Sequence, residues 1–249
     1  YMSVAFIAVT ALQVHVGGGL SELHLGVYVS LAFLLAYRDW KPIVVAALAA
    51  AALASAFIGF EKGRLSSREI PLIAILAALA ALGRIPFAGV PGLQPTTFIV
   101  AASGVVFGPA IGYLVGAFAA LASNIFLGHG PWTFWQMLAW GACGASAGAM
   151  GRLMPRAGRI ALAIFTAAWG YLFGWIMDLW FWYSFVHPIS LASWIAVGAA
   201  SFPADTVHAA GNACFSLLLG NGLMRALRYS KKRLALSSMA CYIRASEPR

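Results

Sequence analysis

Three side chains at the start of an apolar segment could bind a flat molecule with polar edges. The stretch GHGPWTFWQMLAWG covers residues 128–141, and Pro131 suits the first turn of a helix. Trp132, Gln136 and Trp140 then recur every four residues and share one helical face. Tryptophans at such a place also form membrane-interface belts, but a belt does not explain Gln136. A face that alternates indole and amide predicts part of a binding cavity.

Two further polar side chains lie within long apolar runs. Asn124 is near the end of one run, where an amide facing hydrocarbon is costly, so it is expected to face the bundle or a cavity. An interhelical hydrogen bond is the simpler role for it. Asp178 shares a face with Tyr171, Trp175 and Trp182 by its spacing. A carboxylate there indicates either a functional site or a hydrated position near the outer interface.

The last long apolar run contains FPADTVHAAGNACF, with three polar residues on one helical face. Asp205, His208 and Asn212 stand at positions i, i+3 and i+7. They could form a ligand site, a proton relay or a structural network that fixes the last helix. We favour support of a binding cavity, because no other buried chain of acids and bases leads across the membrane.

The sequence predicts no covalent chemistry, metal or cofactor. Cys143 and Cys214 lie in apolar segments and Cys241 in a polar one, without the spacing of a metal knuckle or redox dithiol. His129 has no partner for metal binding in view. A Walker motif is also missing from the sequence, so any ATP hydrolysis would belong to partner subunits.

The elements that carry these residues are predicted to be membrane helices. Of the 249 residues, 62% are hydrophobic and 9% are charged, and the mean hydropathy is +0.85. This composition excludes an ordinary water-soluble domain and predicts an all-α, polytopic integral membrane protein. The candidate apolar runs cover residues 2–16, 23–37, 42–60, 70–83, 96–107, 110–127, 134–151, 160–185 and 200–224.

Basic residues give the predicted orientation of these runs. Segments 61–69, 151–159 and 225–233 carry them, and all fall on one side if residues 70–224 cross six times. The positive-inside rule then places both ends of this part in the cytoplasm, with only Arg84 opposite. We therefore interpret the net charge of +9 as a sign of the orientation of the protein in the membrane. The basic cluster at 225–233 could also contact anionic lipid headgroups. Nucleic-acid binding is not expected.

Small residues recur at helix-packing spacing in two rows. The rows are Gly104, Gly108, Gly112 and Gly116, followed by Gly141, Gly144, Gly148 and Gly151. In lipid, such faces let two backbones approach closely, so we interpret both rows as packing surfaces. Gly108-Pro109 is expected to form a tight turn between two helices.

Several motifs resemble a known transporter family. QPTTFIV, VFGP, SNIFLG, GPWTFWQMLAWG and FPADTVHAAGN follow one another within residues 66–230. In this order they resemble the substrate-binding S components of energy-coupling factor (ECF) vitamin transporters, especially the branch associated with cobalamin uptake. The resemblance implies a six-helix bundle with both ends cytoplasmic, which agrees with the charge pattern.

The resemblance also implies partners and site residues. Such a protein captures a vitamin from outside and docks, within the lipid bilayer, on a T subunit driven by two ATPase subunits. Docking would use an A-x-x-x-A pattern on the first helix, here Ala74 and Ala78, with Ala77 and Ala81 as a second register. The implied substrate-binding residues, with Asn124 added from its position, are Gln94, Pro95, Asn124, Trp132, Gln136, Trp140, Asp178, His208 and Asn212.

The first sixty residues do not fit this picture. LHLGVYVSLAFLLAYRDWKPIVVAA resembles a bacterial membrane sensor segment found before signalling domains. A helix at 42–60 that ends in the cytoplasm would begin outside at Arg38 and Lys41, against the charge rule. We therefore divide the chain into an N-terminal membrane segment at 1–60, an S-component domain at 61–233 and a tail at 234–249, as a natural fusion or a composite.

The sequence thus predicts a substrate-binding subunit in the bacterial inner membrane. Its six-helix bundle would follow about three further apolar helices, and it would be no enzyme. Cobalamin or a related corrinoid is the best guess for the substrate. A membrane sensor module without transport activity is the alternative, and a structural assembly factor is a third.

Overall fold

The computed structural model describes residues 69–90 and 92–246, the backbone alone at 235–246, and residues 47, 50, 51, 53 and 54. The predicted helices at 2–16 and 23–37 and most of the run at 42–60 lie outside these residues. The same holds for the predicted basic segment before Glu69. The division at residue 60 therefore stays a prediction.

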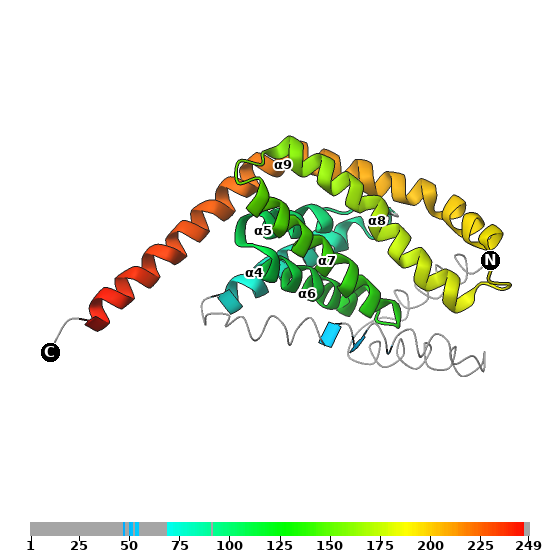
Figure 1. Cartoon of the computed structure of the whole chain (residues 1–249), viewed down its shortest axis with the longest axis horizontal. Coiled ribbons are helices and arrows are strands. Elements are labelled where there is room, and N and C mark those ends of the chain that lie inside the picture. The colour runs from blue at the N-terminus through cyan, green and yellow to red at the C-terminus, as the bar shows by residue number, and fades with distance from the viewer. Residues whose placement is uncertain (1–46, 48–49, 52, 55–68, 91, 247–249) are drawn as a thin grey trace.

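The described chain is a bundle of helices, and the all-α prediction is confirmed. From residue 69 onward the described part contains no strand. The elements are α4 (Glu69–Arg84), η1 (Ile85–Phe87), α5 (Thr96–Phe107), α6 (Pro109–Leu127), α7 (Trp132–Leu153), α8 (Arg159–Phe185) and α9 (Leu191–Ser246). Figure 1 shows α8 and α9 side by side along one flank of α5, α6 and α7.

Glycine and proline end the helices where the sequence predicted. Gly108 has a φ of 100°, in the left-handed region that favours glycine, and Pro109 occupies the first turn of α6. This confirms the tight turn between α5 and α6. Gly128, with a φ of 94°, ends α6 in the same way.

The last helix is much longer than predicted. The apolar run at 200–224 suggested a crossing that began after a long connection, but α9 extends from Leu191 to Ser246. Its first residues are apolar, and after residue 224 it is rich in Arg, Lys, Ala and Leu, which favour helix. At 1.5 Å per residue, α9 measures about 84 Å, against a hydrocarbon layer of about 30 Å. Its C-terminal part projects from the bundle (Figure 1).

Among the residues that the structure describes, three stretches are long and apolar enough to cross a membrane: Glu69–Phe87, Pro109–Leu127 and Arg159–Phe185. The helix Thr96–Phe107 is apolar but shorter. α7 contains tryptophan, glycine and Gln136 among its apolar residues, and α9 carries polar residues within its apolar part. Composition therefore marks these two helices less strongly, although both exceed the roughly 20 residues that a crossing needs.

Glycines let α7 cross α5 and α6 with their backbones in contact. A Cβ on Gly144 would meet the carbonyl oxygen of Gly112, and a Cβ on Gly104 would meet that of Gly144. A Cβ on Gly116 would meet the carbonyl oxygen of Trp140. The two glycine rows therefore face each other, as their interpretation as packing surfaces requires.

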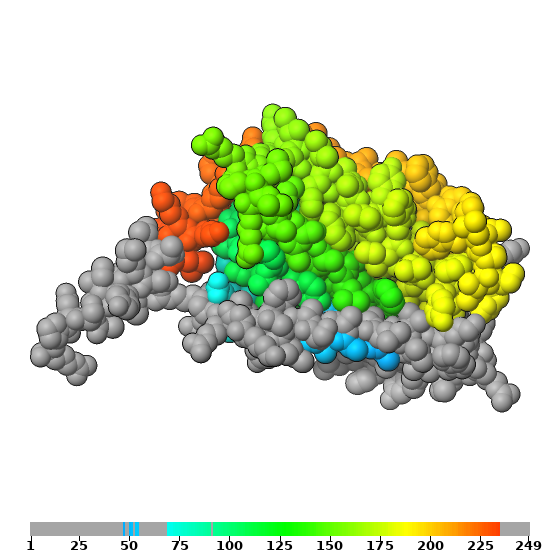
Figure 2. Space-filling model, viewed as in Figure 1, coloured from blue at the N-terminus to red at the C-terminus, as the bar shows by residue number. Residues whose placement is uncertain are grey.

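A second crossing of the same kind joins α8 to α9. A Cβ on Gly170 would meet the backbone of Ala209, and one on Gly174 would meet the carboxylate of Asp205. Gly174 thus leaves space for a polar side chain between the two helices. In Figure 2 the surfaces of α7 and α8 meet along the visible face, so both crossings belong to one packed body.

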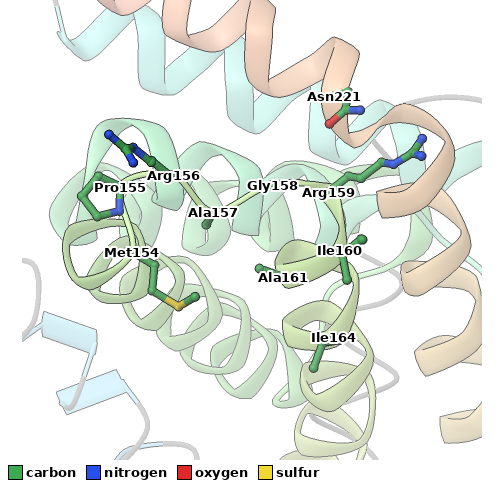
Figure 3. Close-up of a pocket in the computed structure, with 10 residues that line it drawn as sticks. All are labelled: Met154, Pro155, Arg156, Ala157, Gly158, Arg159, Ile160, Ala161, Ile164 and Asn221. Atoms are coloured by element: carbon green, nitrogen blue, oxygen red, sulfur yellow. The ribbon is translucent and has the colours of Figure 1, made fainter.

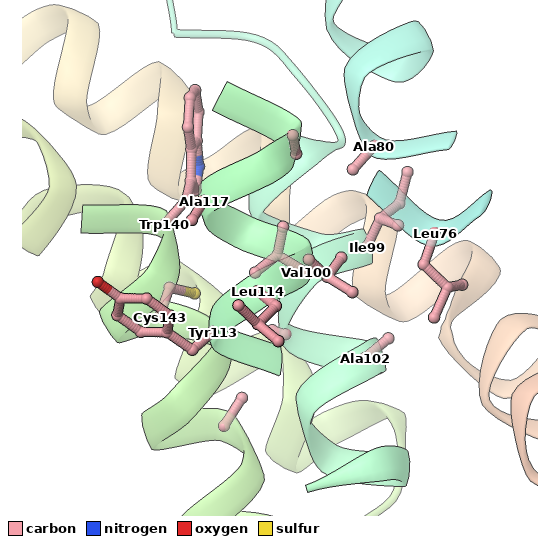
Figure 4. Close-up of a cluster of buried hydrophobic side chains, with 14 of the residues drawn as sticks. Leu76, Ala80, Ile99, Val100, Ala102, Tyr113, Leu114, Ala117, Trp140 and Cys143 are labelled. Atoms are coloured by element: carbon pink, nitrogen blue, oxygen red, sulfur yellow. The ribbon is translucent and has the colours of Figure 1, made fainter. Parts of the chain in front are cut away.

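The core lies where α5, α6 and α7 meet. Val100 and Trp140 are fully buried, and Leu114 and Cys143 pack in the same cluster (Figure 4). Many of its other members are alanines, since the helices are too close together for larger side chains. Trp140 therefore has a fixed place in the core, although it was predicted as a substrate-binding residue.

We expect Gly144→Ala to destabilise the protein by about 1–3 kcal/mol, because the added methyl group forces α6 and α7 apart. Thermal unfolding of the purified protein in detergent measures this. Gly222→Ala is the matched control, because it is also helical and a Cβ there would meet nothing within 4 Å. Equal stability of the two variants would contradict the close crossing.

Candidate functional site

A network of polar side chains occupies the end of the bundle where α4 ends and α7 begins. Its centre is Arg84, the last residue of α4. The guanidinium donates from Nε to Gln94 Oε1 at 3.1 Å, and from Nη1 to Ser123 Oγ at 2.8 Å and Asn124 Oδ1 at 2.7 Å. Arg84 therefore connects α4 to the segment before α5 and to the end of α6.

Asn124 continues the network into α7. Its amide nitrogen donates to Thr133 Oγ1 at 2.9 Å and to Gln136 Oε1 at 2.7 Å. The side chain is only 1% exposed, so its amide is satisfied entirely by neighbouring helices. The interhelical role that the sequence allowed is therefore observed, and it makes Asn124 the link between Arg84 and the first turns of α7.

A second branch passes through the first turn of α5. Trp140 Nε1 donates to Thr97 Oγ1 at 2.9 Å, and the same hydroxyl lies 3.0 Å from His208 Nε2 on α9. Arg84 stands over the Trp140 ring at 5.0 Å, which joins the two branches by a cation–π contact. The other neighbour of this indole is Phe173 of α8, at 4.5 Å between ring centroids.

The segment between η1 and α5 closes this end against α9. Gly92 has a φ of 82°, and a Cβ there would meet the backbone of Ala204. The next residue, Leu93, packs against Gly211, so Gln94 is held over α9 and turned toward Arg84. Pro95 forms the N-cap of α5 and serves as a backbone element of the site.

Asp178 and Asp205 form a separate polar cluster between α8 and α9. Ser201 Oγ lies 2.5 Å from Asp178 Oδ2 and 3.2 Å from Asp205 Oδ2. A hydroxyl group has a single proton, so it cannot donate fully to both carboxylates. Asp205 is 7% exposed, and the absent side chain of Gly174 provides its space.

Two further predicted binding residues are Trp132 and Asn212. Trp132 packs against Trp180 of α8, with 6.4 Å between ring centroids. Asn212 is fully buried one turn after His208, and its side-chain nitrogen and oxygen find no hydrogen-bond partner among the residues that the structure describes. A buried amide without partners is costly, so this position suits contact with a bound molecule or water.

The structure thus connects five of the nine predicted residues in one network: Gln94, Asn124, Gln136, Trp140 and His208. Pro95 contributes its backbone at the N-cap of α5, Trp132 packs against Trp180, and the side chains of Asp178 and Asn212 lie outside the network. Sequence reasoning missed Thr97, Ser123, Thr133 and, above all, Arg84. For Arg84 a signal was available, since it is the basic residue that breaks the charge pattern.

The opposite end of the bundle gathers the other described basic side chains. Lys231 Nζ donates to Val106 O at 2.6 Å, at the last turn of α5, and Arg228 donates to Ala157 O at 3.3 Å. Lys231 thus satisfies a carbonyl group that the C-terminus of α5 leaves free, and Arg228 satisfies one in the α7–α8 connection. An open hollow of about 880 Å³ lies beside them, between the α7–α8 connection and α9 (Figure 3).

We expect Thr97→Val to cost about 1–3 kcal/mol of stability, because it leaves Trp140 Nε1 without its acceptor in a buried place. Ser103→Ala is the control. Ser103 lies on the same helix and is equally buried, but it bonds only to Ile99 O in its own turn. Thermal unfolding compares them, and an equal effect of both would contradict the importance of the Thr97 link.

Comparisons with known proteins agree with this architecture. A family model described as "ECF transporter, substrate-specific component" matches residues 68–220. A UPF0397 protein of Vibrio atlanticus (strain LGP32) is 36% identical over 77 residues, which cover 29% of this chain and 42% of the relative. A UPF0397 protein of Aliivibrio fischeri (strain MJ11) is 35% identical over 78 residues, which cover 29% and 43%.

The chain spans less than half of the length of these curated relatives, and no solved structure matches it significantly. The family model, in contrast, covers more than half of the 249 residues and includes the whole polar network. S components are substrate-binding subunits of transporters and not enzymes. This multi-pass membrane protein therefore belongs to the family of ECF transporter substrate-specific components.

Proposed function

We propose that this protein captures a vitamin at the outer face of a bacterial inner membrane for ATP-driven uptake. The T subunit and two ATPase subunits of an ECF transporter would supply the energy. The observation that carries the proposal is the buried network around Arg84, which offers amide, indole and guanidinium groups at one end of the bundle. Cobalamin or a related corrinoid is the proposed substrate, because the sequence motifs resemble those of S components associated with cobalamin uptake.

The proposed orientation of the bundle in the membrane follows from the positions of its basic side chains. The basic side chains that bind the carbonyl groups of Val106 and Ala157 gather at the end opposite Arg84. The positive-inside rule assigns that end, with the C-terminal part of α9, to the cytoplasm. The Arg84 network then faces outward, where a substrate-binding subunit must meet its substrate.

We assign the pocket to the residues predicted from the sequence, with the additions that the structure suggests. Trp140 and Asn124 are 0% and 1% exposed, so the network is closed in this state. A ligand would reach it by displacing residues 92–95, which lie against α9 where Gly92 meets Ala204 and Leu93 meets Gly211. Asn212, with its unpartnered amide, would then gain partners from the ligand.

The docking face is proposed on α4. Ala74 and Ala78 are exposed, whereas Ala77 and Ala81 are 3% and 4% exposed and pack inside the bundle. Only the first A-x-x-x-A register is therefore free for another helix. Small residues at this spacing permit close approach of a T-subunit helix within lipid.

We expect the double change Ala74→Trp and Ala78→Trp to abolish copurification with a coexpressed T subunit and leave the fold intact. Bulky rings hold two helices apart, but these positions do not contact the core. Ala192→Trp with Ala196→Trp is the matched control, because this exposed pair has the same spacing on α9. Normal copurification of the α4 variant would refute the docking assignment.

We expect a shortened chain that begins at Arg64 to bind cyanocobalamin as tightly as the full chain. The chain from the start of α4 to the end of α9 contains every proposed pocket and docking residue, so the mechanism needs nothing from residues 1–60. Titration calorimetry on both chains in nanodiscs measures this. Binding by the full chain alone, with the shortened chain monodisperse and helical, would favour the sensor alternative.

A further inference from the structure

Arg84 carries a positive charge that no described carboxylate neutralises. Its three hydrogen-bond acceptors are the side-chain oxygens of Gln94, Ser123 and Asn124, all neutral, and it forms no ion pair in the part of the chain that the structure describes. Asp178 and Asp205 are engaged with Ser201 in their separate cluster. A cation within a membrane bundle normally pairs with an anion or lines a polar cavity.

The guanidinium also keeps hydrogen-bonding capacity. Of its five N–H groups, one on Nε and two on Nη1 are used, and Nη2 makes no hydrogen bond to the described residues. The three bonds hold the plane of the group in place, above the Trp140 ring. Nη2 is thus the free side of a fixed cation, which is the arrangement that suits carboxylate or phosphate recognition.

Resting on the proposed function, we propose that Arg84 binds an acidic group, carboxylate or phosphate, of the transported molecule. The anion supplies the charge that the neutral acceptors lack. The rest of the ligand would lie toward the ring and amide groups of Trp140 and Gln136. Cobalamin satisfies this requirement through its phosphodiester, and smaller acidic vitamins satisfy it through a carboxylate.

The alternative is that Arg84 only ties α4 to α6. Matched pairs of probes separate the two roles, because each pair differs in its acidic group. Dicyanocobinamide phosphate and dicyanocobinamide, which differ only in the phosphate, test a phosphate. Biotin with biotinamide, and nicotinate with nicotinamide, test a carboxylate. Titration calorimetry of the full chain in nanodiscs gives the affinity ratio within each pair. This ratio is measured on the wild-type protein, so it does not depend on whether a variant folds.

We expect the acidic member of one pair to bind at least ten-fold more tightly than its neutral partner. Arg84→Gln should reduce this ratio to near one, and Arg84→Lys should retain most of it. Asn124→Asp should abolish it without removing the cation, because a carboxylate in place of the amide would pair with Arg84 permanently. Circular dichroism and thermal unfolding verify that each variant is folded.

Equal binding of the two members in every pair that binds to the wild type would overturn the assignment of an acidic ligand and leave vitamin capture standing. An unchanged ratio in folded Arg84→Gln would do the same. If no probe binds and no small molecule copurifies with the folded wild type in mass spectrometry, the proposed function itself fails, and this inference fails with it.

Discussion

The backbone contact of α7 with α5 and α6 is the constraint on which the rest of the structure depends. Gly144 stands between Gly104 and Gly112, and none of the three positions has room for a Cβ. In lipid there is little hydrophobic force between helices, so close packing of this kind has to hold them together. It also determines where Gln136 and Trp140 lie, since both project from α7 within two turns of this crossing.

The polar network follows from that crossing and from the absence of water. With α7 fixed, Asn124 of α6 meets Gln136, and Trp140 meets Thr97 at the start of α5. Each of these groups would be costly in hydrocarbon without a partner. The side chains of the network therefore form hydrogen bonds with one another when no ligand is bound. A ligand that enters must replace the hydrogen bonds that it breaks.

The sequence predicted the framework better than the site. Gly108-Pro109 marked a helix boundary because its backbone conformation and missing N–H act locally, whereas the length of α9 depends on helix formers outside its apolar run. Gln136 and Asn124 stood out as amides among apolar residues. Thr97 did not, because a threonine is ordinary in such a segment, and only the fold brings Trp140 to it. Arg84 was visible as an exception to the charge rule, but its partners come from three separate segments.

Neutral partners around Arg84 suit a protein that must both bind and release. A carboxylate at the place of Asn124 would satisfy the cation permanently, and a ligand would then have to break an ion pair to enter. Amide and hydroxyl acceptors hold the guanidinium in position at a smaller cost and leave its charge uncompensated. An anionic substrate would therefore gain affinity from the charge, and the return of residues 92–95 to α9 would remain a separate step. The docking that we propose on α4 would then act directly on release, because Arg84 is the last residue of that helix.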